Sequence, residues 1–278
     1  PVKGLDEVEH RYVIAVSNFI RKWAYQNWGV PAGKVFVACN GVTHFPTPRG
    51  LFRIRLERDP YSLIYFSHPS KGLDAAISVL RLLRKEDQRF KLHVYGGAAL
   101  WGGEEEAPDS EPGVIFHGMV GQQDVAQALQ QANISMHLQA RLEPFALALV
   151  EAMGYGAIPI VSPVGGNREA VRDGYNGFWV EGDHQSQKVH QEAADLILRL
   201  ASSPDFADYI RTNSRNIPWN WANQARVWSE HSAWELDGKV TTLLTEVFLC
   251  PECQGECLLT ADGYHCLNCG CYSLDGHQ

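Results

Sequence analysis

Strand-like and helix-like segments alternate along most of this chain, and this alternation limits its fold more than any other feature. Short apolar runs such as YVIAV (12–16) and SLIYFS (62–67) are each followed by a stretch of helical length and character. Repeated β-α units predict an α/β fold, a parallel sheet with helices on both faces. Ligands of such sheets bind at the carboxyl ends of the strands, so we expect the functional site there.

The expected elements follow from the same pattern. The strands are predicted at residues 12–16, 34–39, 62–67, 90–97, 113–118, 133–138, 157–162 and 177–181. The helices are predicted at about 17–28, 72–85, 123–132, 145–154 and 166–174, with two or three more before about residue 245. Residues 43–60 and 98–113 read as a linker and a loop, because they are rich in Pro, or in Gly, Pro and acids.

Composition excludes several classes of protein. The 278 residues suggest one or two domains, and an apolar fraction of 45% is enough for a real core. The formal net charge of −8 argues against a nucleic-acid partner. No apolar run approaches the ~18 residues of a membrane span, and no basic, apolar leader opens the chain. We therefore expect a protein without a membrane span or signal peptide.

Two carboxylates interrupt the apolar segment RLEPFALALVEAMGYGAIPIV (141–161). Glu143 precedes Pro144 and so falls in the loop before a helix expected to begin near Phe145. The first amides of that helix lack intrahelical partners and lie at its positive dipole end, which makes them a candidate anion site. Glu151 has apolar neighbours, where an unpaired carboxylate is costly. It either faces a polar ligand such as a sugar diol or lies on a solvated edge of the helix.

These segments resemble the retaining glycosyltransferases of family 4, which have the GT-B fold of two Rossmann-like domains. EPFALALVE (143–151) resembles their E-x7-E motif, and residues 151–183 follow the family pattern nearly position by position. SHPSKGLDAAISVL (67–80) resembles the phosphate-lysine segment. Residues 13–42 resemble the last β-α-β unit of the N-terminal domain, and 218–236 the C-terminal helices. The resemblance implies a Rossmann-like parallel sheet, the C-terminal half of a GT-B enzyme.

The resemblance also implies roles for individual residues. Glu151 matches the glutamate that holds the ribose hydroxyls of a donor nucleotide. Glu143 matches the catalytic glutamate near the transferred sugar, which steadies its hydroxyls and the developing positive charge. Lys71 matches the lysine that neutralises the leaving pyrophosphate, although by residue type alone it would be a solvated surface lysine. The amides that face sugar hydroxyls and phosphate correspond to Phe145, Ala146 and Leu147.

The chain departs from the family pattern in three places. The phosphate-binding arginine expected a few residues before the lysine is missing, and Phe66, Ser67 and His68 occupy that region. Ala146 stands where the family usually has a glycine. Nearly all of the N-terminal acceptor-binding domain, on the order of 150 residues, has no counterpart. The resemblance therefore implies that catalysis needs this domain or a partner chain.

Other residues have a simpler explanation beside the functional one. Gly165 and Gly166 line the donor site in the resemblance, or only make the turn that ends a strand, as Gly96 and Gly97 also could. Four histidines are expected to be packed or surface side chains rather than ligands, and four tryptophans to be core residues rather than sugar platforms. They are His68, His93, His117, His137, Trp219, Trp221, Trp228 and Trp234.

Six of the seven cysteines lie in the last 30 residues, a clustering that points to metal and to a reducing compartment. CPECQGECLLTADGYHCLNCG (250–270) contains two C-x2-C knuckles, which predict a tetrahedral zinc site in a zinc ribbon, or else unliganded thiols. The predicted ligands are Cys250, Cys253, Cys266 and Cys269, and Cys257 or Cys271 could replace a neighbour. The tail has no Lys or Arg after residue 247, which favours a structural or protein-contacting role over nucleic-acid binding.

Together these observations predict the donor-binding half of a cytoplasmic glycosyltransferase with a structural zinc. Its donor would be a UDP-, GDP- or ADP-sugar, and the resemblance implies no catalytic metal. The predicted parts are an N-terminal remnant and linker (1–45), a nucleotide-sugar-binding domain (46–245) and a zinc ribbon (246–278). The alternative is a non-catalytic nucleotide-sugar-binding or scaffold module. A nicotinamide dehydrogenase is disfavoured, because no G-x-G-x-x-G follows any strand.

Overall fold

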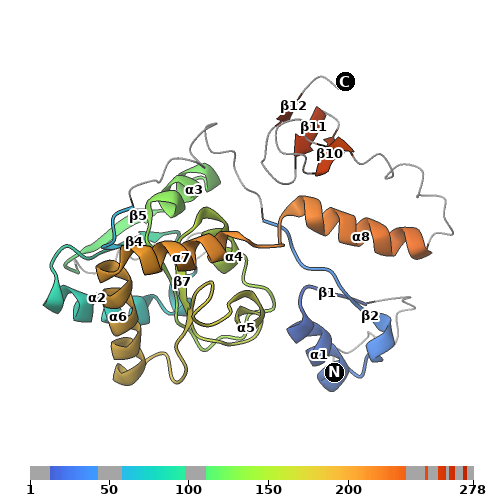
Figure 1. Cartoon of the computed structure of the whole chain (residues 1–278). Coiled ribbons are helices and arrows are strands. Elements are labelled where there is room, and N and C mark those ends of the chain that lie inside the picture. Colours follow the sequence, from blue (N-terminus) through green and yellow to red (C-terminus); the bar gives the residue numbers. More distant parts are fainter. Residues whose placement is uncertain are drawn as a thin grey trace. The chain divides into compact units, whose positions relative to one another are not determined.

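The computed structural model describes residues 13–42, 58–97 and 111–235, and the strand residues 248–249, 256–260, 263–266 and 272–273. The chain divides into two compact units (Figure 1). The first comprises Pro1–Val37 and Thr47–Ile217, and the second Ala38–Pro46 and Pro218–Gln278. The predicted division at residues 45 and 245 stays a prediction.

A six-stranded, entirely parallel sheet forms the centre of the first unit. Its strand order is β5-β4-β3-β6-β7-β8, which is the doubly wound order of Rossmann folds. The strands are β3 (Ser62–Tyr65), β4 (Lys91–Tyr95), β5 (Val114–Gly118), β6 (Ile134–His137), β7 (Ile158–Val161) and β8 (Phe178–Trp179). The sequence-based prediction of an α/β, Rossmann-like fold is therefore confirmed.

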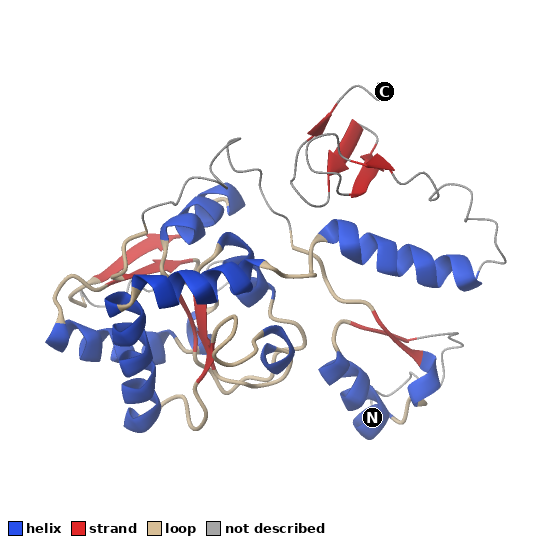
Figure 2. Ribbon diagram, viewed as in Figure 1, coloured by secondary structure: helices blue, strands red, loops and turns tan. Residues whose placement is uncertain are grey.

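Helices cover both faces of this sheet (Figure 2). β3, β6 and β7 are buried at every position, which a parallel sheet achieves only when both faces are covered. α2 packs against α6, while α4 packs against α3 and α7. The bounds are α2 (Leu73–Glu86), α3 (Gln122–Gln131), α4 (Leu147–Tyr155), α5 (Asn167–Ala170), α6 (Gln187–Ser202) and α7 (Pro204–Arg215).

The first unit also contains a small β-α-β segment. β1 (Val13–Ala15) and β2 (Val35–Val37) pair in parallel, and α1 (Asn18–Trp28) connects them ahead of a short 3-10 helix, η1 (Ala32–Lys34). Ser17 caps α1 by accepting a hydrogen bond from the Ile20 amide, and Gly29 ends it with a φ of 68°.

The second unit contains α8 (Trp221–Glu235) and a four-stranded antiparallel sheet of order β12-β11-β10-β9. The strands are β9 (Phe248–Leu249), β10 (Glu256–Thr260), β11 (Gly263–Cys266) and β12 (Tyr272–Ser273). β10 and β11 pair antiparallel, with Cys257 opposite Cys266. The zinc ribbon itself stays a prediction. Cys250, Cys253, Cys269 and Cys271 lie outside the described residues.

Two predicted helix bounds were wrong. The helix expected from about Phe145 begins at Leu147, because Ala146, its N-cap, has a ψ of 80°, outside the helical range. The helix expected over 166–174 is only α5, since Val171 is extended with φ −105° and ψ 128°. Most of the predicted linker, residues 43–57, lies outside the described residues.

Candidate functional site

The candidate site lies where the strand order reverses, at the carboxyl ends of β3 and β6. These two strands are neighbours in the sheet, but the chain leaves them toward opposite sides. A crevice at such a switch point is the common ligand site of doubly wound folds. The loop after β3 carries Lys71, and the loop after β6 carries Glu143.

Lys71 ends a short 3-10 helix, η2 (Pro69–Lys71), between β3 and α2. His68 caps this helix through Nδ1, which accepts from the Ser70 amide at 3.1 Å. Gly72 follows with a φ of 96°, and a Cβ built there would lie 1.8 Å from the Leu138 carbonyl oxygen. Glycine is therefore required here for both conformation and space, and it brings the loop after β3 against the end of β6.

Glu143 is 8% exposed and forms an ion pair with Lys71, with 2.7 Å between Nζ and Oε1. Gln139 approaches the same oxygen through Nε2 at a longer 3.4 Å. A buried carboxylate needs such partners, because desolvation of the charge is costly. The structure thus brings together the predicted catalytic carboxylate and the predicted phosphate lysine.

Gly165 and Gly166 hold the backbone of the same loop. The Gly166 amide donates to the Glu143 carbonyl at 2.7 Å. A Cβ built on Gly165 would lie 2.5 Å from that carbonyl oxygen, and one built on Gly166 would lie 2.9 Å from the Pro144 oxygen. These glycines therefore do more than end a strand: their lack of a side chain allows close approach to the Glu143 loop.

The amides predicted to form an anion site differ from one another. The Leu147 amide donates to the Phe145 carbonyl at 3.0 Å, so it is already engaged. Ala146 is the N-cap of α4 and has no side-chain cap. Its carbonyl accepts the first helical bond, from the Val150 amide. The positive end of α4 thus follows Glu143 by a few residues, with fewer open donors than predicted.

Glu151 is half-buried in α4, and burial raises the pKa of its carboxyl above the ordinary 4.5. Within the described part of the chain no hydrogen bond or ion pair of its carboxylate is recorded. This agrees with the unpaired acid that the sequence indicated. It leaves both oxygens available to a ligand or to water.

The histidines agree with the simpler explanation. His137, at the end of β6, is buried, and burial lowers its pKa to about 3, so its ring is neutral. His93 and His117 lie on adjacent strands with their Nδ1 and Nε2 atoms 3.0 Å apart, and the Tyr95 ring stacks on His117 at 4.2 Å.

The expectation of core tryptophans was wrong for two of them. Trp221 and Trp228 are 52% and 40% exposed. Their spacing of seven residues puts both on one side of α8. Among the described residues of the second unit α8 is the only helix.

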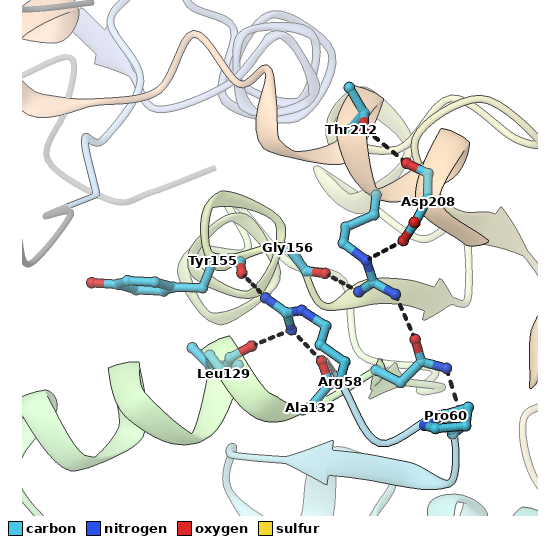
Figure 3. A network of polar contacts seen from close by, with 10 residues as sticks. Arg58, Pro60, Leu129, Ala132, Tyr155, Gly156, Asp208 and Thr212 are labelled. Carbon is cyan, nitrogen blue, oxygen red and sulfur yellow. Dashed lines mark hydrogen bonds and ion pairs between the residues drawn. The ribbon is translucent and has the colours of Figure 1, made fainter. Parts of the chain in front are cut away.

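Sequence reasoning missed a buried network around Arg58, which it placed in the linker. Its guanidinium donates to the carbonyls of Leu129 at 2.8 Å, of Ala132 and of Tyr155, at the C-terminal ends of α3 and α4 (Figure 3). Arg211 donates to the Gly156 carbonyl at 2.6 Å. Cations suit these helix ends because of the dipole. The network fixes α4 from the end opposite Glu143.

The fold is that of a Rossmann-like α/β domain of GT-B architecture. Residues 59–217 match the family model described as "Glycosyl transferases group 1". The match covers more than half of the chain, so this protein belongs to that family. In the described part of the chain, no helix is long and apolar enough to cross a membrane.

Curated relatives include glycogen synthases of Rhodopseudomonas palustris. The chain is 34% identical to that of strain BisA53 over 103 residues, and 32% identical to that of strain BisB18 over 179 residues. These matches cover 37% and 61% of this chain, and 21% and 37% of the relatives. A D-inositol 3-phosphate glycosyltransferase of Streptomyces griseus is 29% identical over 40% of this chain and 23% of its own. The chain thus spans well under half the length of these relatives.

Solved structures share the fold. Anabaena Alr3699/HepE in complex with UDP has a TM-score of 0.63 and 21% identity, with 81% of this chain and 64% of that chain covered. The pneumococcal O-GlcNAc transferase GtfA, in complex with UDP and GlcNAc, has a TM-score of 0.62 and 18% identity. Its match covers 83% of this chain and 46% of that chain.

Proposed function

We propose that this chain supplies the donor side of a retaining glycosyltransferase of family 4. It would bind a nucleotide sugar at the carboxyl ends of β3 and β6 and present the sugar for transfer with retained configuration. The observation that carries the proposal is the ion pair of Lys71 with the buried Glu143, at 2.7 Å. The pair lies at the ligand-binding edge of the sheet, beside the N-terminus of α4.

The chemistry of sugar transfer explains why these two charges lie together. When the bond from the anomeric carbon to the diphosphate breaks, negative charge develops on the leaving oxygen and positive charge on the sugar. Lys71 would stabilise the first and Glu143 the second. A lysine ammonium has three hydrogens, so Lys71 has donors to offer a phosphate oxygen from its place beside Glu143.

The remaining predicted donor residues fit around this pair. Glu151, about one turn into α4, would accept the two ribose hydroxyls of the nucleotide. The Ala146 amide would face the donor, and Gly165 and Gly166 would keep the backbone of the Glu143 loop close. UDP is the first nucleotide to test, because two structural relatives were solved in complex with it; GDP- and ADP-sugars come next.

The acceptor side is proposed to come from elsewhere. In a two-domain transferase the second domain closes the cleft, excludes water and brings the acceptor within reaction distance. Here β1, α1 and β2 are the described remainder that resembles that domain, and two strands with one helix are too little for an acceptor site. The chain alone is expected to bind a nucleotide sugar without efficient transfer. Robust multiple turnover on an acceptor panel would contradict this.

Calorimetry with UDP-, GDP- and ADP-sugars tests the donor proposal. Lys71→Ala should weaken the best donor at least about tenfold, since a charge-assisted contact to phosphate is lost. Lys188→Ala, at an exposed position of α6, is the matched control and should leave affinity unchanged. No binding of any nucleotide sugar by the unaltered chain would refute the proposal. Binding without transfer, even with the acceptor domain supplied, would favour a scaffold module.

We also propose that the C-terminal tail holds one structural zinc in a reducing, cytoplasmic compartment. The support is the pair of C-x2-C knuckles in the sequence, together with the antiparallel pair β10–β11 between them. The register places Cys257 opposite the predicted ligand Cys266, so Cys257 could replace a neighbouring cysteine as ligand. So small a segment has too little core to fold without metal.

A further inference from the structure

Hydrogen bonds link three segments that are distant in the chain: the N-terminus of α1, the Glu143 loop and α5. The Glu169 carboxylate of α5 accepts from the Asn18 amide at 3.0 Å, from the Asn18 side-chain amide at 3.2 Å and from the Phe19 amide. The amides of Asn18 and Phe19 open α1 and have no helical partners of their own. A carboxylate at this position also meets the positive end of the helix dipole. Glu169 thus caps a helix that begins about 150 positions earlier in the chain.

Ser17 makes the second connection. It is 1% exposed, and its hydroxyl donates to the Pro144 carbonyl at 2.6 Å while it accepts from the Ile20 amide at 3.1 Å. The same side chain therefore caps α1 and binds the residue directly after Glu143. Because a single hydroxyl serves both contacts, α1 cannot move away from the loop without loss of one of them.

The third connection joins α5 to the Glu143 loop. The Gly166 amide, one residue before α5, donates to the Glu143 carbonyl at 2.7 Å. Glu169, three residues later, holds α1. The Glu143–Pro144 backbone is thus held from one side by α5 and from the other by Ser17, while Lys71 holds the carboxylate itself. The loop, α1 and α5 form one hydrogen-bonded unit.

We propose that Glu169 and Ser17 are positioning residues, a latch that couples the docking of α1 to the placement of Glu143. The functional meaning of the latch rests on the proposed donor site. α1 belongs to the segment that resembles the last unit of the acceptor domain. A latch at this place lets that unit control whether the Glu143 loop has the geometry that binds the donor. Acceptor-domain docking and donor binding would then favour each other.

Residue-resolved hydrogen exchange tests the latch without any assumption about activity. Glu169→Gln replaces one acceptor oxygen by an NH2 group that opposes a backbone donor, and Ser17→Ala removes the bond to Pro144. Each variant should speed exchange at least about threefold at the first amides of α1. It should do the same at the Leu147 amide, which opens α4 directly after the Glu143 loop. Exchange in the buried strand β7 should stay unchanged. Glu181→Gln is the matched control, because Glu181 is an exposed carboxylate that pairs with Arg168, at 3.0 Å.

Two results would overturn the latch. Acceleration confined to α1 would make Glu169 a local helix cap, and equal acceleration in β7 would show a general loss of stability. Calorimetry on the same variants adds a second readout: each should bind the donor several-fold more weakly than Glu181→Gln does. If the unaltered chain binds no nucleotide sugar, the proposed function fails, and the exchange data alone still decide whether the latch exists.

Discussion

Replacement of Glu151 separates a ligand-binding carboxylate from one that merely lies on a helix edge. The residue is half-buried in α4, and burial raises the pKa of its carboxyl. A group whose pKa is raised by folding stabilises the folded state only below its unfolded pKa, and this contribution is lost as the pH rises through the folded pKa. At pH 8 the ionised Glu151 therefore costs stability. Glu151→Gln should unfold at a higher temperature than the unaltered chain at pH 8, with the difference fading toward pH 4.

Replacement of Glu151 by alanine should weaken nucleotide binding. Two hydrogen bonds from ribose hydroxyls to an ionised carboxylate contribute about 1.5–3 kcal/mol each. Part of this is offset, because water reaches the half-buried carboxylate when no ligand is bound. A net loss of roughly 2–4 kcal/mol remains for Glu151→Ala, which is a roughly 30- to 900-fold rise in Kd. Affinity of the unaltered chain should also fall as the pH drops toward the raised pKa, because the protonated carboxyl accepts less well.

Calorimetry with the best nucleotide sugar at pH 8 and pH 5.5 measures both effects. A nucleotide sugar suits the test better than free UDP, because its diphosphate lacks the terminal phosphate group that titrates near pH 6. Glu192→Gln, at an exposed position of α6, is the control. Unchanged affinity in Glu151→Ala, together with an unchanged unfolding temperature in Glu151→Gln, would place the carboxylate on a solvated edge and refute the assignment.

Three further outcomes are expected. Lys71→Ala should lower the free energy of unfolding, measured by urea titration, by about 1–2 kcal/mol, a value that allows for the partial exposure of the lysine. The double variant Lys71→Ala with Glu143→Gln should recover most of this loss, because no unpaired buried charge remains. Gly72→Ala should lower the free energy of unfolding by about 3 kcal/mol or more, since its Cβ would meet the Leu138 carbonyl. A fall of the unfolding temperature by under about two degrees would contradict the geometry. Elemental analysis of protein purified without chelator should find about one zinc per chain, and chelation should unfold the tail while the body up to about residue 240 keeps its structure.

The elements of this fold could be predicted, but their order in space could not. Hydrophobic periodicity placed every strand of the parallel sheet within a few residues, because each strand is a short apolar run between turn signals. The order β5-β4-β3-β6-β7-β8 depends on which crossover follows which strand, and a periodic pattern does not contain that information. Helix bounds failed where the local backbone conformation overrode propensity, as at Ala146, whose ψ of 80° lies outside the helical range.

In the candidate site, too, the residues could be predicted but their mutual contacts could not. Lys71 and Glu143 could be identified from motifs, yet nothing in either motif indicated that the two side chains pair with each other. Gln139, the bond from Ser17 to Pro144 and the bonds of Glu169 went unnoticed, because each contact joins residues that are distant in the chain or lack any motif. Local patterns reveal residue types suited to a chemistry, and long-range packing decides which of them meet.

The missing arginine gives the Lys71–Glu143 pair a consequence for donor binding. Between β3 and α2 the sequence offers Lys71 and His68 as its basic side chains, and His68 is engaged as the cap of η2. A diphosphate bound at Lys71 would therefore share its ammonium with Glu143. Attraction to phosphate would draw the ammonium away from the carboxylate, and a buried carboxylate that loses its cation seeks other donors. Gln139 approaches one of its oxygens, and the hydroxyls of a bound sugar could reach the other. Donor binding would then itself turn Glu143 from a partner of Lys71 into a partner of the sugar. A nucleotide without the sugar would leave that exchange incomplete and should bind more weakly than the intact donor.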